Sequence, residues 1–214
     1  QRLSWHQGVL YRGVGNQVTG IDDNAGFGKP PPAGVKALFS FTLPSGIAVH
    51  DVAVDGAGQH IVVANSGTND QLRLIELATG KQLWSRGGLA ASLHRVVWRP
   101  DGSELLVTGG GTGAQVLATK SGKTLFGLPG HLKVVTAIAW SGNGTRLLTA
   151  SRDGAVRLWR RTASGVVGIA TSIRHCAWPC SDIGGVVDLR FRTASGSEWL
   201  TVGADGGVIG WRLP

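Results

Sequence analysis

GHLKVVTAIAWSGNGTRLLTASRDGAVRLWR, residues 130–160, contains short apolar runs separated by turns rich in Gly, Asn, Asp and Ser. Apolar runs of this length, bounded by turn residues, are typical of β-strands. The stretch also holds a His, a Thr and an Asp, which are residue types that build nucleophilic active sites. It is therefore either a structural unit of antiparallel strands or a catalytic constellation.

The pattern of this stretch returns along the chain as a repeat. Four segments align with one another: GQHIVVA, GSELLVT, GTRLLTA and GSEWLTV, which begin at Gly58, Gly102, Gly144 and Gly196. Successive glycines of this set are 44, 42 and 52 residues apart, and such a spacing is typical of a four-stranded propeller blade. Alternating apolar segments precede and follow each of the four, so the sequence predicts an all-β fold.

The repeats predict a β-propeller with about five visible four-stranded blades in a single domain that covers residues 1–214. The expected blades comprise residues 1–46, 47–88, 89–129, 130–174 and 175–214. The last of these units shows three strands only, and a propeller closes when the other end of the chain lends the missing strand, yet here the chain also opens on a first strand. We therefore expect the chain to be part of a larger, seven-bladed propeller.

Four side chains of the quoted stretch have a spacing that points to a family. Asp153 follows His131 by 22 residues and Thr149 by four, and it precedes Trp159 by six. This set resembles the WD-repeat family, in which a His, a Ser or Thr, an Asp and a Trp form a buried hydrogen-bonded tetrad. The resemblance implies that Asp153 accepts from the His131 ring or from turn amides. It also implies that His131 bonds Thr149 and that Thr149 reaches the indole N–H of Trp159.

The last unit keeps part of this structural tetrad. Thr201, Asp205 and Trp211 have the same spacings, but Ile183 stands where the His would be. The two middle units lack both the turn Asp and the third-strand Trp, and they align only through strands and turns. The resemblance is therefore sharp in one unit, good in another and weak in the rest.

A catalytic role for His131, Thr149 and Asp153 is disfavoured by their surroundings. A nucleophile needs exposure beside a base, whereas Thr149 lies within the apolar run RLLTA, residues 146–150. An indole N–H such as that of Trp159 can only donate, so the polar set is expected to hold strands together. We predict that the chain is not an enzyme and that it holds no cofactor and no metal.

The charge of the chain indicates acidic partners. Lys and Arg outnumber Asp and Glu by 21 to 13, which gives a net charge of +8 and attracts acidic proteins or nucleic acid. The cations are dispersed, with no basic tract longer than Arg160-Arg161, and this favours protein partners. The alternative is an RNA- or DNA-associated subunit of a ribonucleoprotein. It is suggested by five nearby arginines, Arg146, Arg152, Arg157, Arg160 and Arg161.

Two further motifs invite a ligand. His175, Cys176 and Cys180 suit zinc chemically, but a structural site needs a fourth ligand, so idle thiols are expected. Two cysteines are too few for a disulfide scaffold, which favours a reducing intracellular compartment such as the cytoplasm or nucleus. The segment GGGTG, residues 109–113, lacks the Lys-Ser/Thr and the helix of a phosphate loop and is expected to be a tight hairpin loop. No apolar run reaches 18 residues, so membrane insertion is not expected.

A second alternative comes from ATGKQLW, residues 78–84. This segment resembles the outer-strand motif of quinoprotein propellers, in which Gly makes a turn and Trp packs between blades. It supports an oxidoreductase with a quinone cofactor at the propeller axis. The acidic metal ligands and the adjacent cysteine pair of such enzymes are not visible in the sequence.

The WD-repeat resemblance implies binding rather than chemistry. We therefore predict a non-catalytic protein–protein interaction scaffold or adaptor, a subunit of a multiprotein complex whose other subunits present acidic surfaces. The family pattern directs residues just before the turn Asp and near the start of the first strand toward partners, and an Arg there can bind a carboxylate in bidentate fashion. The candidate partner-binding residues are Lys133, Arg152, His94, Arg95 and Trp178.

Overall fold

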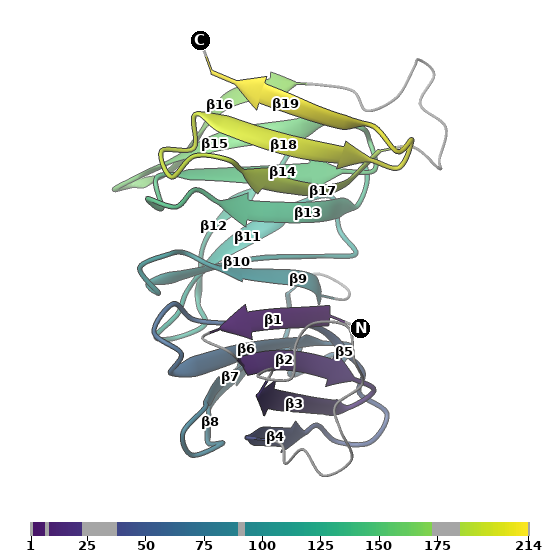
Figure 1. Cartoon of the computed structure of the whole chain (residues 1–214), viewed down its shortest axis with the longest axis vertical. Coiled ribbons are helices and arrows are strands. Elements are labelled where there is room, and N and C mark those ends of the chain that lie inside the picture. The colour runs from purple at the N-terminus through teal and green to yellow at the C-terminus, as the bar shows by residue number, and fades with distance from the viewer. Residues whose placement is uncertain (1, 7–8, 23–37, 90–92, 173–184, 214) are drawn as a thin grey trace. The chain divides into compact units, whose positions relative to one another are not determined.

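The structure is a computed structural model that describes residues 2–6, 9–22, 38–89, 93–172 and 185–213 (Figure 1). All regular secondary structure in these residues is β-strand, which confirms the predicted all-β class. The chain divides into two compact units, unit 1 (Gln1–Val96) and unit 2 (Val97–Pro214). The assignment of residues 1–214 to one domain with the five expected blade ranges stays a prediction.

Unit 1 contains two four-stranded antiparallel sheets, each with its strands in chain order. The first sheet comprises β1 (Arg2–His6), β2 (Val9–Val14), β3 (Gln17–Asp22) and β4 (Phe39–Thr42). The second sheet comprises β5 (Val49–Val54), β6 (His60–Asn65), β7 (Leu72–Glu76) and β8 (Gln82–Arg86). Tyr11, Val18 and Phe39 of the first sheet pack against Ile61 and Val63 of the second in one buried cluster.

A third four-stranded sheet follows, and the division between the units falls within its first strand. It comprises β9 (Leu93–Trp98), β10 (Glu104–Gly109), β11 (Ala114–Ala118) and β12 (Thr124–Leu128). The segment GGGTG joins the antiparallel strands β10 and β11, so the predicted hairpin loop is confirmed. Strand β11 follows this segment directly, in the place of a helix whose N-terminal amides could face a phosphate.

The remaining two sheets belong to unit 2. The fourth comprises β13 (Val135–Trp140), β14 (Arg146–Ser151), β15 (Val156–Thr162) and β16 (Gly165–Ser172). The fifth has three strands in the described residues, β17 (Val186–Phe191), β18 (Glu198–Gly203) and β19 (Val208–Arg212). Alternation along β13 directs Ala137 toward the fifth sheet and Ile138 toward the third, because successive side chains of a strand point to opposite faces. The fourth sheet is therefore buried on both faces.

The turn between the first and second strands repeats in four sheets. The four glycines that begin the aligned segments all have positive φ, between 66° and 74°: Gly58, Gly102, Gly144 and Gly196. A side chain at such a φ is strained, whereas Gly adopts it freely. The repeat that is visible in the sequence is therefore a repeat of one turn conformation.

The first strands of the second and fourth sheets contain a β-bulge, which redirects one side chain. The register against the second strand shifts between Val49 and Asp51 in β5 and between Val135 and Ala137 in β13. The residues skipped are His50 and Thr136. His50 Nδ1–H donates to the carbonyl oxygen of Leu93 at 2.8 Å, and the Thr136 hydroxyl donates to that of Val186. These bulges thus aim a donor at the first strand of the following sheet.

The outer strands of the second, third and fourth sheets carry a bulge of their own. The register shifts between Leu74 and Ile75, between Val116 and Leu117, and between Leu158 and Trp159. In each case one residue of the outer strand has no partner in the ladder, and it is an aliphatic residue exposed by 40–46%: Leu83, Leu125 and Ile169. A local kink with an exposed aliphatic side chain is therefore part of the repeat.

Candidate functional site

The four side chains of the predicted tetrad meet in the fourth sheet. His131 precedes β13, Thr149 lies on β14, Asp153 lies in the turn between β14 and β15, and Trp159 lies on β15. His131 Nε2 is 2.8 Å from Thr149 Oγ1, and Trp159 Nε1 donates to the same oxygen at 3.1 Å. His131 Nδ1 is 3.2 Å from Asp153 Oδ2. The hydrogen bonds thus form one continuous chain from Trp159 to Asp153.

The donors and acceptors of these hydrogen bonds determine which imidazole nitrogen of His131 carries the proton. The indole of Trp159 only donates, so Thr149 Oγ1 accepts there and has its own proton left to donate to His131 Nε2. Nε2 is then unprotonated, and Nδ1–H donates to Asp153. With His131 neutral and its proton on Nδ1, every polar side chain of this hydrogen-bonded set has a partner, as buried polar groups require.

Burial and hydrogen bonding shift the pKa values of His131 and Asp153. Burial of the imidazole lowers the pKa of His131 below 6.5, and this outweighs the attraction of Asp153. Burial alone would raise the pKa of Asp153, but the amides of Leu132 and Ala155 and the His131 ring hold it below 3.8. The two shifts correspond to a neutral imidazole beside an ionised carboxylate.

Asp153 also fixes the loop that carries His131. Its Oδ2 accepts from the backbone N–H of Leu132 at 2.7 Å, and its Oδ1 accepts from that of Ala155 at 2.8 Å. Ser151 donates its hydroxyl to the carbonyl of Lys133 at 3.0 Å. One carboxylate and one hydroxyl therefore hold the loop before β13 against the turn after β14.

In the fifth sheet the structure brings together two of the three predicted residues. Trp211 Nε1 donates to Thr201 Oγ1 at 2.9 Å, and Thr201 is fully buried. Asp205 is exposed and accepts from the backbone N–H of Gly207 at 2.9 Å. Its carboxylate thus shapes its own turn, and the stretch before β17 where a His would stand lies outside the described residues.

Apolar residues occupy the tetrad positions of the second and third sheets. Strand pairing places Val63 and Val107 where the fourth sheet has Thr149, and both are buried. Ile75 and Leu117 stand in register with Trp159 and are fully buried. In these two sheets an apolar pair replaces the Thr and Trp of the fourth sheet. No buried polar group is then left without a hydrogen bond at these positions, and no motif marks them in the sequence.

The arrangement around His131 is poorly suited to catalysis. Thr149 has no exposed surface, and the His131 side chain has none either. Both hydrogen-bonding positions of the imidazole are taken by Thr149 and Asp153, so a substrate proton has no base to reach. Two cavities, of about 380 and 410 Å³, lie elsewhere, and they are lined by residues such as Phe191 and Arg190 in unit 2 and Asn16 and Ile47 in unit 1.

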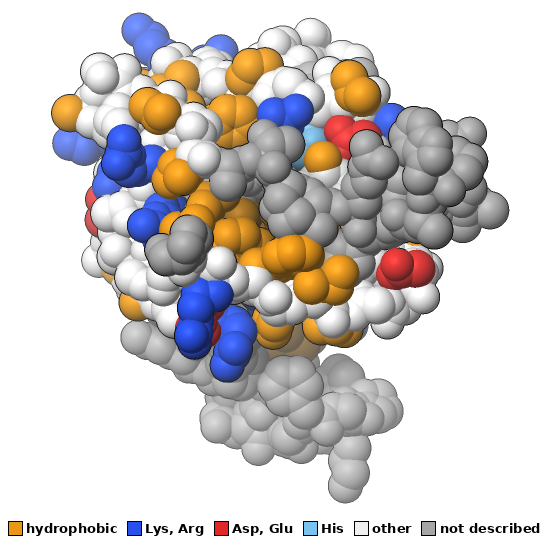
Figure 2. All heavy atoms as spheres, turned by 90° about the horizontal axis from the view of Figure 1, so that it is seen from above, with side chains coloured by type: hydrophobic (Ala, Val, Ile, Leu, Met, Phe, Trp, Pro, Cys, Tyr) orange, Lys and Arg blue, Asp and Glu red, His pale blue; other side chains and the backbone are white. Residues whose placement is uncertain are grey.

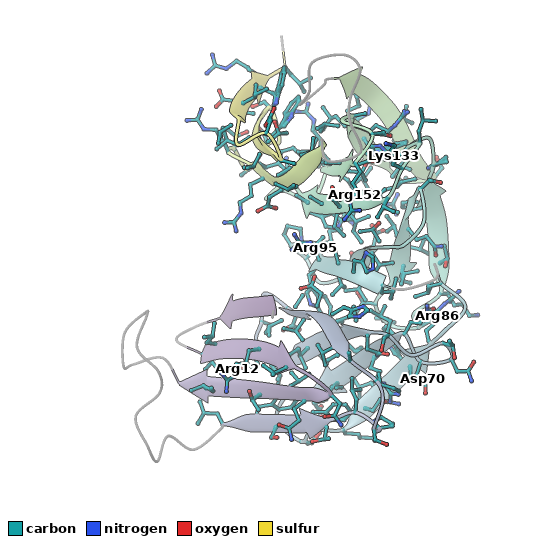
Figure 3. The ribbon with its side chains drawn as sticks, turned by 90° about the vertical axis from the view of Figure 1, so that its right-hand side faces the viewer. Arg12, Asp70, Arg86, Arg95, Lys133 and Arg152 are labelled. Carbon is teal, nitrogen blue, oxygen red and sulfur yellow. The ribbon has the colours of Figure 1, made fainter. Side chains whose placement is uncertain are left out.

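Two of the candidate partner-binding residues lie on the loops that the tetrad holds. Arg152 is exposed on the turn after β14, and Lys133 is half-buried on the loop before β13 (Figure 3). The Arg152 backbone N–H donates to the carbonyl of Val134 at 3.0 Å, which ties the two loops together. Directly before Lys133 in the sequence lies Leu132, an 85% exposed leucine that sequence reasoning passed over.

Of the remaining candidate partner-binding residues, the structure describes His94 and Arg95. His94 and Arg95 lie on β9 and are assigned to unit 1, and the His94 ring contacts the His50 ring edge-on with centroids 5.8 Å apart. Trp178 lies outside the described residues, as do His175, Cys176 and Cys180. Within the described part of the chain, no group of three His, Cys, Asp or Glu side chains could hold a metal ion.

A buried ion pair in unit 2 was missed by sequence reasoning. Glu104 of β10 is 5% exposed, and Arg161 of β15 donates to it from Nε at 3.0 and 3.1 Å and from Nη2 at 2.6 Å. The same guanidinium lies 4.8 Å from the centroid of the Phe126 ring. The partners are 57 residues apart in the chain, so no local spacing could have revealed them.

The five clustered arginines are used in different ways. Arg161 is taken by Glu104, Arg157 donates to the carbonyl of Gly130, and Arg146 is half-buried. Arg152 and Arg160 are exposed and lie at opposite ends of the hairpin formed by β14 and β15. Figure 2, a view from above Figure 1, shows the Lys and Arg side chains of the described residues on the face turned to the viewer scattered among hydrophobic ones.

Comparison with known proteins finds matches in sequence. The family model "WD domain, G-beta repeat" matches residues 122–160, which include the whole tetrad. Pre-mRNA-processing factor 19 homolog 2 of Arabidopsis thaliana is 40% identical over 63 residues, 29% of this chain and 12% of that protein. Pre-rRNA-processing protein IPI3 of Mycosarcoma maydis is 28% identical over 137 residues, 60% of this chain and 23% of that protein. Striatin-4 of Mus musculus is 29% identical over 136 residues, 61% of this chain and 18% of that protein.

Comparison with solved structures gives the fold. A chain from "Crystal Structure of Mitotic Checkpoint Complex" matches with a TM-score of 0.77 at 17% identity, covering 99% of this chain and 60% of that one. The predicted β-propeller of WD-repeat type is therefore confirmed as the fold. The chain spans less than a quarter of the length of the three curated relatives named above. The described residues contain no helix long and apolar enough to cross a membrane.

Proposed function

Since the chain belongs to the WD-repeat family, we propose that it is a non-catalytic scaffold that holds protein partners within a multiprotein assembly. Propeller proteins of this kind present loops on a rigid framework, and binding surfaces are commonly carried by such loops. The proposed partners present acidic surfaces, because the chain carries a net charge of +8.

One observation carries this proposal. The residues that looked catalytic, His131, Thr149 and Asp153, bond one another inside the fourth sheet. What remains at the surface is the pair of loops that they hold, with Arg152 and Lys133 on them. Their role is therefore to position a surface rather than to transform a substrate.

The printed names of the relatives support membership of an assembly. Two of them refer to the processing of pre-mRNA and of pre-rRNA, and the solved neighbour comes from a structure titled as a complex. Applied to this chain, these names favour a subunit of a complex that works on RNA. The proposed location is the cytoplasm or nucleus. These are reducing compartments, and a chain with only two cysteines in 214 residues does not depend on disulfides.

A second candidate function is direct RNA contact within such a complex. It is favoured by the two RNA-processing names and by the net charge. Against it stands the use of Arg161 and Arg157 in internal bonds, which leaves Arg152 and Arg160 at opposite ends of their hairpin. Two separated cations release few counterions from a phosphate backbone, so protein contact is the first proposal.

The test is the sedimentation of the full-length protein in a native extract, before and after RNase treatment. A scaffold sediments with a discrete set of proteins at fixed stoichiometry, and RNase leaves the peak unchanged. Migration as a monomer at low salt would contradict the scaffold. A shift to the monomer position after RNase would instead support the RNA-associated subunit.

A further inference from the structure

A cavity of about 380 Å³, here called the Arg190 pocket, lies between the fourth and fifth sheets, at the end of β13 opposite to the loop of His131. It is lined by Ala139 and Trp140 of β13, by Gly142 of the following turn, and by residues 190–194 at the end of β17 and in the turn to β18. Strands β13 and β17 lie side by side and point the same way, so their ends meet at this edge (Figure 1). Pockets of about 300–1,000 Å³ are usual for ligand binding.

The walls of the Arg190 pocket are fixed by the packing of unit 2. The backbone N–H of Asn143 donates to the carbonyl of Ala194 at 2.9 Å. A Cβ atom at Gly142 would lie 3.1 Å from both the Cα and the Cβ of Ala194, so the two turns are already in close contact. Trp140 belongs to a buried cluster, and Phe191 is half-buried. The pocket is therefore formed before a ligand arrives, and binding there loses little conformational entropy.

The charged side chains that line the pocket are both arginines, Arg190 and Arg192. Arg190 is exposed, and its side chain makes no ion pair with another described residue. Arg192 Nη1 is 3.6 Å from Glu198 Oε2, but Glu198 Oε1 also accepts from Arg212 Nε at 2.7 Å, so one carboxylate serves two guanidinium groups. Asp188, two residues before Arg190, accepts from the next backbone N–H and does not line the pocket. The lining therefore carries positive charge.

The hydrogen-bonding capacity that the lining has to spare is that of donors. Guanidinium groups donate and cannot accept. The hydroxyl oxygen of Thr193 already accepts from the backbone N–H groups of Ser197 and Glu198, at 3.1 and 3.2 Å. The other lining residues are apolar or glycine: Ala139, Trp140, Gly142, Phe191 and Ala194. A ligand that fits this lining therefore brings anionic acceptors together with an apolar group.

We infer that the Arg190 pocket binds an acidic peptide segment of a partner protein, in which an Asp or Glu stands next to an aliphatic side chain. The carboxylate pairs with Arg190 and Arg192, and the apolar lining covers the aliphatic side chain. RNA fits less well, because a base stacks on the face of an aromatic ring, whereas Trp140 is 9% exposed and Phe191 is half-buried. This inference rests on the proposed scaffold function and gives the scaffold a contact at the opposite end of β13 from the loops that the tetrad holds.

The test is selection of a displayed library of random twelve-residue peptides on the full-length protein, at physiological salt. We expect enrichment of peptides in which Asp or Glu is adjacent to Leu, Ile or Val. Binding of the enriched peptides should fall at least tenfold with Arg190→Glu, which reverses a charge, and at least tenfold with Ala194→Glu, which adds a carboxylate to the lining. Both positions are exposed, so the fold should be retained, and circular dichroism and the melting temperature verify this.

The chain offers a matched control for each variant. Residues 161–165 and 192–196 share the sequence RTASG, so Ala163→Glu repeats the change at Ala194 in an identical, exposed segment that does not line the pocket. Arg160→Glu reverses an exposed arginine of β15 that does not line the pocket either. Neither control should change peptide binding more than twofold. The inference is overturned if no such peptides are enriched, if the controls weaken binding as much as the test variants, or if single-stranded polyuridine displaces the peptides at the same salt.

Sedimentation of the full-length protein in a native extract separates this inference from the proposed function. If the wild type sediments with its partners and Arg190→Glu loses at least one of them, the pocket is used within the assembly. If Arg190→Glu keeps the same partners, the scaffold stands and the partner contact through this pocket is refuted. A wild type that migrates as a monomer refutes the scaffold itself, and the peptide selection then still decides whether the pocket binds acidic segments.

Discussion

Thr149 Oγ1 lies 2.8 Å from His131 Nε2, and neither side chain reaches solvent. One hydroxyl therefore serves two buried nitrogens, because Trp159 Nε1 donates to it as well. In the fifth sheet the equivalent hydroxyl of Thr201 receives the Trp211 indole. Each of these threonines accepts an indole N–H, and the contribution of the Thr149 hydroxyl to stability can be measured.

Thr149→Val should destabilise the protein by roughly 2–4 kcal/mol, because two buried nitrogens lose their partner and each costs about 1–3 kcal/mol. Urea unfolding of Thr149→Val, with the exposed Thr42→Val as control, gives the comparison. A loss no larger than that of Thr42→Val would contradict the chain of hydrogen bonds through His131.

Asp153→Ala should lower the free energy of unfolding by about 3 kcal/mol, because the carboxylate accepts from His131, Leu132 and Ala155. The neighbouring exposed change, Arg152→Ala, should stay within about 0.5 kcal/mol of the wild type. Thermal unfolding followed by circular dichroism measures both. An unchanged melting temperature for Asp153→Ala would show that the tetrad does not stabilise the sheet.

Stability should fall as the pH drops below about 6.5. The pKa of His131 is lowered in the folded protein, so the unfolded chain takes up a proton that the folded chain refuses. Stability is lost from the unfolded-state pKa of about 6.5 downward. The lowered pKa of Asp153 acts in the same direction below about 3.8.

Urea midpoints at pH 7.5 and pH 5.5 test this, with His131→Gln as the comparison that removes the titrating group. The difference between the two pH values should shrink in that variant. A wild type that gains stability at pH 5.5 relative to the variant would mean that His131 is charged in the folded state.

Arg161→Met should cost about 3 kcal/mol, because the buried carboxylate of Glu104 loses the guanidinium that donates to it and keeps only Arg99, whose Nη1 is 3.8 Å away. The double variant Glu104→Leu/Arg161→Met should recover at least half of that loss, since an apolar pair can replace a buried ion pair. A double-mutant cycle by urea unfolding measures the coupling. Additive losses would show that the two residues do not depend on each other.

Sequence reasoning was most successful where structure is local. The turn around Gly144 and the spacing from His131 to Trp159 depend on residues close in the chain, so pattern alone located them. The ion pair of Glu104 with Arg161 could not be found in this way, because it exists only after two sheets pack. Leu132 was also passed over, since exposure depends on how the loop is folded and not on residue type.

The second and third sheets show a further limit of prediction from sequence. Val63 and Ile75 carry no polar signature, and only the register of β6 with β7 reveals that they fill the positions of Thr149 and Trp159. Hydrophobic residues of similar size are interchangeable in a core, so the sequence retains the strand but loses the motif. The spacing of the turn glycines remained visible because their positive φ allows few substitutes.

The bulges at Leu83, Leu125 and Ile169 have a consequence for self-association. A flat outer strand offers unpaired N–H and C=O groups on which another chain can be templated into a fibril. A kink at the same place in three sheets breaks that template, even though an exposed aliphatic side chain stands at each one. Deleting one of these residues would remove the kink, and the outer strand of that sheet should then pair more readily with another chain.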